Sequence, residues 1–374
     1  MNSESVDLIY LDPPFNSKTN YAAPIGSAAA GAAFKDTWTL SDLDTEWIDL
    51  MEHQHSVLWR VLLAAMTDSD KSYLAYMSIR LMEMHRILKP TGLLYLHCDP
   101  TMSHYLKLVL DAIFGRSQFR NEIVWCYSGG GMSRNNFPRK HDIIFRYAKQ
   151  DATITYNVER KPYKENTQQV GKHSTYSGGH DIDLERGTPI TDWWTDIKTV
   201  TGWSSERTGY PTQKPLALLQ RIVKTSSNPG DVVLDPFCGC ATALVAADDL
   251  GRNWVGIDIS GKAAELVVQR IEERQGLFRN IIHRRDIPDR TDLGPLPRYN
   301  SPENRTQLYG QQGGHCAACD EHFQSRHLEV DHIIARNKGG TDHISNLQLL
   351  CGHCNRVKGD RGMAYLREKL QLAA

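Results

Sequence analysis

Apolar runs of strand length alternate with longer segments of helical spacing over the first 150 residues of this 374-residue chain. Strands that follow one another through helices normally pair in parallel, with the helices covering both faces of the sheet. The alternation therefore predicts a doubly wound, Rossmann-like α/β sheet. The expected strands are 6–12, 92–98, 121–127 and 142–149, and the expected helices are 72–88 and 105–115.

The same pattern returns after a long interruption. Strands are expected at 231–237 and 253–259, with a helix at 243–251 between them and a further helix ending near Arg274. The pattern predicts five segments: a catalytic half (1–150), a polar insert rich in Thr, Gly and Trp that suits target recognition (151–209), a cofactor-binding half (210–275), a linker rich in Arg, Asp and Pro (276–308), and a compact Cys/His module (309–374).

Charge is informative only locally, because the formal net charge is -1. Between Arg134 and Lys172 nine Lys or Arg residues stand against four Asp or Glu, and aromatic residues are interleaved with them. Such a mixture suits phosphate contact with base stacking, although an ordinary solvated surface would look the same. No apolar run approaches the roughly 18 residues of a membrane span, and no secretory signal is visible. We therefore expect a cytoplasmic protein with no membrane partner.

The segment Asp12-Pro13-Pro14-Phe15 comes directly after the first expected strand. Ligands of open α/β sheets bind at the carboxyl ends of strands. The lone pair of a base amine is delocalised into the ring, so a carboxylate and a backbone carbonyl that accept its N–H bonds would make it a better nucleophile. Asp12 and the Pro13 carbonyl suit that role, Pro14 stiffens the loop, and Phe15 can stack on a flipped base. A simple turn after a strand is the alternative interpretation.

A second segment, running from Asp235 to Thr242 as DPFCGCAT, also follows a strand and opens a helix. Its small residues would let a cofactor approach the backbone closely. Asp258 follows the next strand, at the position where an acidic residue commonly holds ribose hydroxyls. Upstream, Gln213 and Lys214 in the segment YPTQKP offer polar groups that could hold a carboxylate of the cofactor.

These three segments, in this order, resemble the β class of DNA amino-methyltransferases over roughly residues 1–275. The resemblance implies a methyltransferase sheet and transfer of a methyl group from S-adenosylmethionine to an exocyclic amine of double-stranded DNA. It also implies roles by position: Asp12 would bind the target amine, Phe15 would stack on the base, Phe237 and Gly239 would line the cofactor pocket, and Asp258 would hold the ribose. Asp235 and Thr242 belong to the same cofactor segment.

Two departures from the family pattern stand out. Cys240 and Ala241 replace the usual Ser and Gly, and the strand with Asp12 is almost the first element, without the family's preceding Gly-Asp strand. A natural short form and a truncated reading frame are both open. Asp at the first motif position favours adenine N6 within the family, with cytosine N4 as the alternative. Cytosine C5 methylation is not expected, because its enzymes use a Pro-Cys loop and this chain has no Pro-Cys pair.

The last module contains two C-x-x-C pairs, Cys316 with Cys319 and Cys351 with Cys354, at zinc-ligand spacing. The sequence between and after them (EVDHI, GG, NLQLLC, HCN-x-x-K) resembles the HNH nuclease family over about residues 314–360. The resemblance implies a ββα-metal module fastened by structural zinc. His332 would activate water, Asn346 would orient His332, and Asp331 and Asn355 would hold Mg²⁺ or another divalent cation.

Three functional hypotheses follow from the two resemblances. The first is a methyltransferase that retains an active nuclease, as one arm of restriction–modification or phage defence in a prokaryotic or phage-encoded protein. The second is a methyltransferase whose zinc module only clamps DNA. The third is a nuclease that uses an impaired methyltransferase half to read sequence. A homodimer is also expected, because many relatives of the family dimerise.

Overall fold

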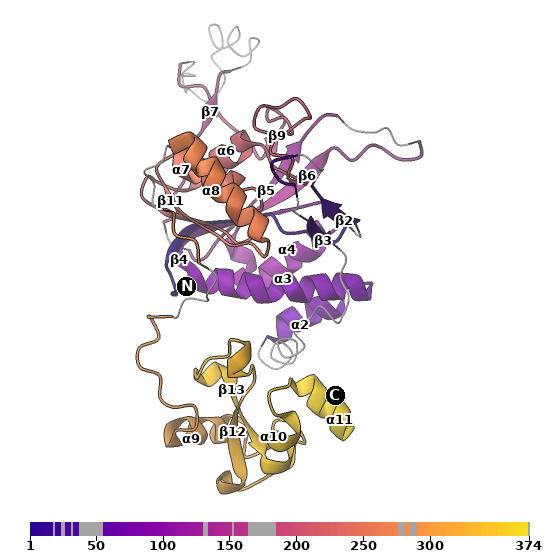
Figure 1. Ribbon diagram of the computed structural model, residues 1–374, viewed down its shortest axis with the longest axis vertical. Helices are drawn as coiled ribbons and strands as arrows, with labels where there is room; N and C mark the ends of the chain where they lie inside the picture. Colours follow the sequence, from indigo (N-terminus) through magenta and orange to yellow (C-terminus); the bar gives the residue numbers. More distant parts are fainter. Residues whose placement is uncertain are drawn as a thin grey trace, which may run out of the picture. The chain divides into compact units, whose positions relative to one another are not determined.

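Figure 1 shows the computed structural model of the chain. It describes residues 1–17, 19–23, 27–30, 33–36, 55–129, 134–151, 153–163, 185–275, 281–284 and 290–372. The chain splits into two compact units, the first made of Met1–Thr37 with Leu81–Pro288 and the second of Trp38–Arg80 with Asp289–Ala374. The boundary at residue 80 falls within α3 (Asp68–Ile87), and each unit is described by itself below.

A seven-stranded sheet forms the centre of the first unit, in the order β11-β10-β1-β4-β6-β5-β9. The first four strands in this order pair in parallel, whereas β6 pairs antiparallel with both β4 and β5, and β9 pairs parallel with β5. The bounds are β1 Val6–Leu11, β4 Leu88–Cys98, β5 Phe119–Cys126, β6 His141–Ala148, β9 Trp193–Trp194, β10 Val232–Asp235 and β11 Asn253–Gly256.

The sheet is thus mixed: the parallel pairing expected from the alternation of strands and helices is found for β11, β10, β1 and β4, whereas β6 runs antiparallel to its neighbours. No helix was expected between 121–127 and 142–149, and the chain returns directly from β5 to β6 as an antiparallel pair. Parallel neighbours would have needed a longer crossover connection. The strand expected at 253–259 also ends early, at Gly256, so that Asp258 lies in the loop that follows β11.

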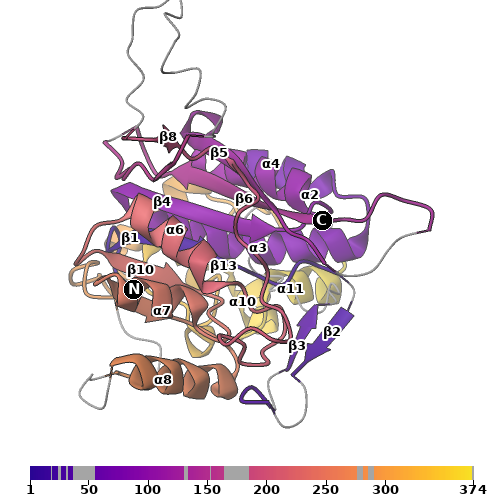
Figure 2. The same ribbon diagram turned by 90° about the horizontal axis from the view of Figure 1, so that it is seen from above.

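Helices cover both faces of this sheet, as Figures 1 and 2 show. The buried faces of α6 (Leu216–Ser226) and α7 (Thr242–Asp249) pack in one cluster with Leu8, Tyr10 and neighbouring residues of the sheet. On the opposite face, Phe114 of α4 (Ser103–Phe114) contacts Tyr147 of β6, with ring centroids 5.7 Å apart. Next to α7, the helix α8 (Gly261–Gln275) completes a smaller cluster around Leu244 and Ile271.

The insert predicted at 151–209 is described only outside residues 152 and 164–184. Its described part includes a short pair, β7 (Arg160–Lys161) with β8 (Thr188–Pro189), and the edge strand β9. Trp194 is buried and its indole nitrogen donates to the Thr191 carbonyl, at 2.8 Å. Trp193 and Trp203 are 56% and 97% exposed, so packing explains only one of these three tryptophans. A second antiparallel pair, β2 (Thr19–Ala22) with β3 (Ala33–Asp36), follows the Asp12 loop.

The second unit contains a ββα arrangement near the carboxyl end of the chain. The antiparallel pair β12 (Leu328–His332) and β13 (Leu347–Cys351) leads into α10 (Gly352–Lys358), and α11 (Met363–Leu370) follows. An additional helix, α9 (Pro302–Gln311), begins inside the segment predicted as a linker. The Ser301 hydroxyl caps it by accepting from the Asn304 amide, and Leu308 anchors it in the module's core. The unit also includes α2 (Ser56–Leu63). None of the described helices is long and apolar enough to cross a membrane.

Replacement of Leu8 by Ala tests whether the centre of the sheet carries the stability of the first unit. Leu8 has no exposed surface and lies opposite Val233 of β10 and Leu93 of β4. Loss of its side chain leaves a cavity, so the free energy of unfolding should fall by about 2–5 kcal/mol in denaturant titrations. Leu108→Ala on α4 is the control, because Leu108 is 49% exposed and should change stability little. Equal effects of the two variants would contradict this packing.

Candidate active site and metal centres

One edge of the main sheet gathers the polar residues of the first unit. Asp12 follows the end of β1, Asp235 ends β10, and His97 lies at the end of β4. Since these strands are parallel neighbours, their carboxyl ends meet at the same edge. Asp142 joins them from the start of β6, because the antiparallel strand begins where its neighbour β4 ends.

The Asp12 carboxylate is held by a lysine that is distant in sequence. Both of its oxygens accept from Lys214 Nζ at 2.7 Å, and the two side chains are only 17% and 10% exposed. The same ammonium lies 5.0 Å from the centroid of the Phe15 ring. Beyond Phe15, the Asp36 carboxylate accepts from the backbone amides of Asn16 and Ser17, at 2.6 and 2.8 Å. The loop after β1 is therefore fixed at Asp12 and again just beyond Phe15.

The turn after β10 has the open backbone expected of a cofactor loop. Gly239 has a φ of +47°, and a Cβ added there would lie 3.0 Å from the Tyr210 ring. Ala241 is also left-handed, with φ +67°, at the start of α7. The Asp258 carboxylate accepts from the Gly239 amide at 2.9 Å and from the Ser260 amide at 2.8 Å. Asp258 therefore ties the loop after β11 to the turn after β10.

Three carboxylates converge at this edge, and their charges are coupled. Burial raises the pKa of Asp235 well above its usual range, and the charges of Asp12 and Asp258 raise it further against the hydrogen bond from the Phe237 amide. Burial raises the pKa of the Tyr210 hydroxyl as well, and Asp258 adds to the effect. A bound cation would relieve this repulsion. The donor set and the glycine turn therefore fit S-adenosylmethionine, which carries a sulfonium and an ammonium group.

The other residues of the cofactor prediction have partners within the first unit. The Gln213 amide oxygen accepts from the Thr208 amide and hydroxyl at 2.8 Å, and its nitrogen donates to the Glu206 carbonyl at 2.7 Å. Thr242 is buried and accepts from Arg270 at 3.2 Å. Gln213 thus shapes the loop before α6, and Lys214 contacts Asp12.

His97 is a buried residue that the motif analysis missed. Its ring lies 2.8 Å from the Tyr10 hydroxyl through Nδ1 and 3.0 Å from the Asp142 carboxylate through Nε2. The Phe15 ring stacks on it, with centroids 5.9 Å apart and an angle of 27°. A polar residue two positions beyond the buried Tyr95, on the same face of β4, is the signal that could have identified it.

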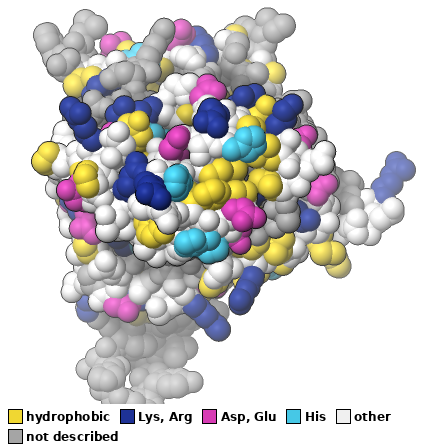
Figure 3. All heavy atoms as spheres, turned by 90° about the horizontal axis from the view of Figure 1, so that it is seen from below, with side chains coloured by type: hydrophobic (Ala, Val, Ile, Leu, Met, Phe, Trp, Pro, Cys, Tyr) yellow, Lys and Arg dark blue, Asp and Glu magenta, His cyan; other side chains and the backbone are white. Residues whose placement is uncertain are grey.

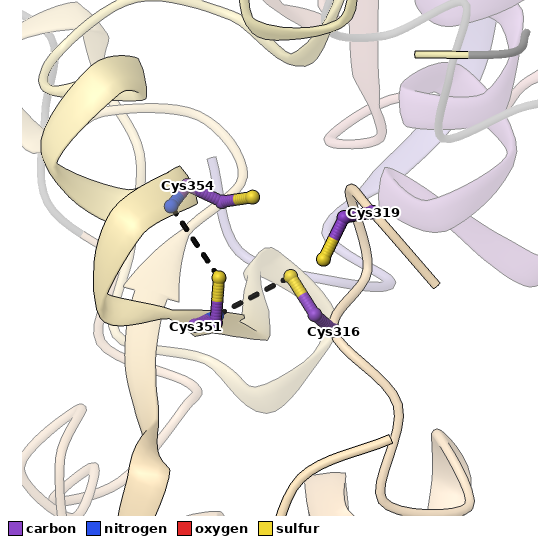
Figure 4. A group of neighbouring side chains, drawn as sticks. All are labelled: Cys316, Cys319, Cys351 and Cys354. Carbon is purple, nitrogen blue, oxygen red and sulfur yellow. Dashed lines mark hydrogen bonds between the residues drawn. The ribbon is translucent and has the colours of Figure 1, made fainter. Parts of the chain in front are cut away.

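The four cysteines of the C-terminal unit form one cluster. Their sulfur atoms all lie within 4.8 Å of one another, and three of the four residues are buried. Figure 4 shows Cys351 and Cys354 at the start of α10 facing Cys316 and Cys319 of the loop after α9. The Cys351 amide donates to the Cys316 sulfur at 3.2 Å. Although burial alone would raise the pKa of Cys316, the hydrogen bonds from Cys319, Cys351 and Ala318 lower it. Four thiols in this arrangement fit a structural zinc ion.

The nuclease-like residues meet in the ββα arrangement beside this cluster. His332 Nε2 lies 2.8 Å from the Asp342 carboxylate, which also accepts from Arg336 at 2.9 Å. The Asn346 amide oxygen accepts from the Ile334 amide at 2.9 Å, and its nitrogen donates to the carbonyls of Ile334 and Thr341. Asn346 therefore binds the loop that follows His332, and Asp342 is a contact of His332 that the motifs did not indicate.

The two residues expected to hold a divalent cation lie on β12 and α10. Asp331 Oδ2 accepts from Gln348 at 2.9 Å and pairs with Lys358 at 3.1 Å. Lys358 is fully buried and also donates to the His332 carbonyl, at 2.9 Å. The Asn355 nitrogen donates to Glu329 at 2.6 Å, which turns the amide oxygen, the atom that a cation would bind, away from Glu329. Carboxylate and amide oxygens suit a hard cation such as Mg²⁺.

Figure 3 shows one face of the molecule from below the view of Figure 1. On this face a hydrophobic area is bordered by Lys, Arg and His side chains and also by Asp and Glu side chains. Basic side chains of this kind suit contact with phosphates.

Gly239→Ala tests the cofactor loop. The added methyl group meets Tyr210 and the backbone keeps an unfavourable left-handed φ, so the loop should shift. Strain of about 1–3 kcal/mol should weaken S-adenosylmethionine binding by roughly tenfold or more in calorimetric titrations. Gly261→Ala is the matched control, because no atom lies within 4 Å of its added Cβ. Unchanged affinity in Gly239→Ala would contradict this placement of the cofactor.

Cys351→Ser tests the metal cluster. The purified chain should contain about one zinc ion by elemental analysis, and the variant should lose it and unfold its C-terminal unit at a lower temperature, because structural zinc stabilises small modules. Cys126→Ser, outside the cluster, should keep the metal. A fully metal-loaded Cys351→Ser protein would refute the four-cysteine site.

Two separate segments of the chain match known protein families. Residues 6–269 match the family model described as DNA methylase, of the N6/N4 type, and residues 316–361 match the HNH endonuclease model. The type II methyltransferase M.EcaI of Enterobacter cloacae is 31% identical over 262 residues, which cover 54% of this chain and 58% of M.EcaI.

Two further relatives match a larger share of this chain. M.HpaI, a type II methyltransferase of Haemophilus parainfluenzae, is 30% identical over 285 residues, or 76% of this chain and 74% of M.HpaI. The DNA adenine methyltransferase YhdJ of Escherichia coli strain K12 is 28% identical over 284 residues, or 72% of this chain and 77% of YhdJ. The chain thus spans little over half of M.EcaI and about three quarters of the other two. It belongs to the N6/N4 family of DNA methylases and carries an HNH endonuclease domain near its carboxyl end.

Proposed function

We propose that the chain methylates an exocyclic amine of double-stranded DNA at a specific site, with S-adenosylmethionine as the methyl donor and adenine N6 as the target. The observation that supports this most is the meeting of Asp12 with the Asp235–Gly239 turn at one edge of the sheet. A methyl donor over the turn and an amine at Asp12 would be neighbours. This proximity is what a direct displacement requires.

The cofactor would be held by the chain's own loops. Phe237 and Gly239 would line its pocket, Asp258 would hold the ribose, and the cationic groups of the cofactor would favour the ionised form of Asp235 against the repulsion from Asp12 and Asp258. Bound in this way, S-adenosylmethionine supplies a methyl group already activated by the positive sulfur. The Asp258 carboxylate accepts from the Gly239 amide, so ribose and turn would be positioned together.

Asp12 would orient the target amine. A carboxylate has about four lone-pair sites, so with two directed to Lys214 it can still accept a bond from the amine. The Pro13 carbonyl would take the second N–H, and Phe15 would stack on the flipped base. Lys214, first expected to bind the cofactor, would instead hold Asp12 in place for this step.

The choice of adenine over cytosine has two supports. Asp12 stands at the motif position where Asp favours adenine within the family, and the relative YhdJ is a DNA adenine methyltransferase. Cytosine N4 is the alternative, since both amines present the same hydrogen-bond pattern to a carboxylate and a carbonyl. A homodimer remains a prediction.

Asp12→Asn tests the methyltransferase proposal. The amide keeps the shape of the side chain but replaces one acceptor oxygen by a donor, so methyl transfer to DNA should fall by about a hundredfold or more. Mass spectrometry of digested nucleosides measures the product, which should be N6-methyladenine in the wild type. Asp7→Asn, on the same strand but paired with Lys89, is the control and should keep most activity. Undiminished transfer by Asp12→Asn would contradict the role of Asp12.

A second activity, DNA cleavage, is supported by the ββα arrangement. His332 would activate water, with Asp342 holding its ring, while Asp331 and Asn355 would bind the divalent cation that stabilises the leaving oxygen. The alternative for this unit is a zinc-fastened clamp that binds DNA without cutting it. The buried Lys358 is compatible with both the nuclease and the clamp, because it binds the His332 carbonyl and the Asp331 carboxylate and so stabilises this part of the unit in either case.

His332→Ala separates these two alternatives. Wild-type protein with Mg²⁺ or Mn²⁺ should nick supercoiled plasmid. The variant should still bind DNA, but its nicking rate should be lower by about a hundredfold or more. His327→Ala, an exposed histidine of the same unit, should nick normally. Undiminished nicking by His332→Ala would exclude this nuclease site. A wild-type protein that binds DNA without nicking it would favour the clamp.

A further inference from the structure

A network of polar groups lies buried beneath the Asp12 loop. His97 has no exposed surface, and both of its ring nitrogens are hydrogen-bonded, one to the Tyr10 hydroxyl and the other to the Asp142 carboxylate. The second oxygen of Asp142 accepts from the Tyr127 hydroxyl at 3.0 Å. The network therefore links β1, β4 and β6 to the residue that follows β5, at the edge where the candidate site lies.

The protonation of the network follows from its surroundings. Burial raises the pKa of Asp142, but the hydrogen bond and charge of His97 outweigh it, so the net pKa is lowered. Burial together with Asp12 raises the pKa of Tyr10, which keeps its hydroxyl proton. The ionised Asp142 carboxylate lies 3.0 Å from His97 Nε2, and the Tyr10 hydroxyl lies 2.8 Å from His97 Nδ1. Both ring nitrogens thus have a polar partner, and these two contacts hold the imidazole plane.

Aromatic contacts transmit this fixed plane to the loop. Phe15 stacks on His97, whereas Trp125 and Tyr10 meet the imidazole edge-on, with centroids 5.8 and 6.2 Å away. Trp125 is itself held by a 2.9 Å bond from its indole nitrogen to the Ile197 carbonyl. The Phe15 ring is consequently supported by a ring whose orientation is set by hydrogen bonds.

An apolar side chain would fill the same space without burying polar groups. A buried polar network is stabilising only if all its members are paired, and it fixes orientation more than it adds stability. The network lies against Phe15, so it would fix the orientation of the ring on which a flipped base would stack.

We propose that His97, held by Asp142, is a positioning residue that sets the Phe15 platform for the target base. The proposal rests on the proposed methyltransferase function. His97 touches neither substrate nor cofactor in this scheme. It acts through Phe15, on the step in which the flipped base is stacked and its amine directed toward Asp12.

Two variants and one matched control test this inference. His97→Phe keeps an aromatic ring but loses both hydrogen bonds, and Asp142→Asn weakens the anchor from a side chain that is 13% exposed. Tyr95→Phe is the control, because Tyr95 is buried on the same face of β4 and its hydroxyl is bonded to Ser226 at 2.6 Å. The measurements are S-adenosylmethionine affinity, kcat and KM for DNA, and the fluorescence of 2-aminopurine at the target, in a duplex bearing the site found by methylome sequencing of expressing cells.

Both variants should bind S-adenosylmethionine within about twofold of wild type, but kcat should fall by about a hundredfold and the flipped-base fluorescence should weaken, since small misplacements of the reactive group have large effects on rate. Tyr95→Phe should keep wild-type kcat. If His97→Phe fails to fold, Asp142→Asn decides the question.

Normal kcat and fluorescence in either folded variant would overturn the inference, as would a parallel loss of cofactor binding, which would mark a general structural role. A wild-type protein that transfers no methyl group to DNA would instead contradict the proposed function itself.

Discussion

The parallel pairing of β1 with β10 is the constraint on which the candidate site depends. Leu8 and Ile9 lie opposite Val233 and Leu234, so the two strands end together although their residues are separated by more than 200 positions in sequence. The pairing of these two strands is therefore enough to make the Asp12 loop and the turn after Asp235 neighbours. Packing of α6 and α7 on the same face holds both strands in register.

Charge balance at this edge explains much of the local structure. Asp12 and Asp258 lie close enough to raise the pKa of Asp235, and Lys214, which is bound to Asp12, offsets only part of this effect. A cationic methyl donor would offset the negative charge that remains. The Phe15 ring contacts both Lys214, which is paired with Asp12, and His97, which is bonded to Asp142.

Local sequence patterns predicted much of this arrangement, and long-range pairings were beyond them. The strand before Asp12, the turn at Gly239 and the four-cysteine cluster each leave a signal within a few residues. The contact of Lys214 with Asp12 joins residues 202 positions apart, and its segment could equally have faced the cofactor. Antiparallel pairing of β5 and β6, the His97 network and the Asp342 contact likewise depend on which strands and loops become neighbours. α9 was assigned to a linker because its few apolar residues give no clear helical period.

The structure of a complex with sinefungin, an S-adenosylmethionine analogue in which an amine replaces the reactive methyl group, would locate the methyl donor relative to Asp12. The analogue should lie over the Gly239 turn with its ribose at Asp258 and its extra amine directed toward the Asp12 loop. An analogue bound elsewhere, or one whose amine points away from Asp12, would contradict the assignment of this sheet edge as the methyl-transfer site.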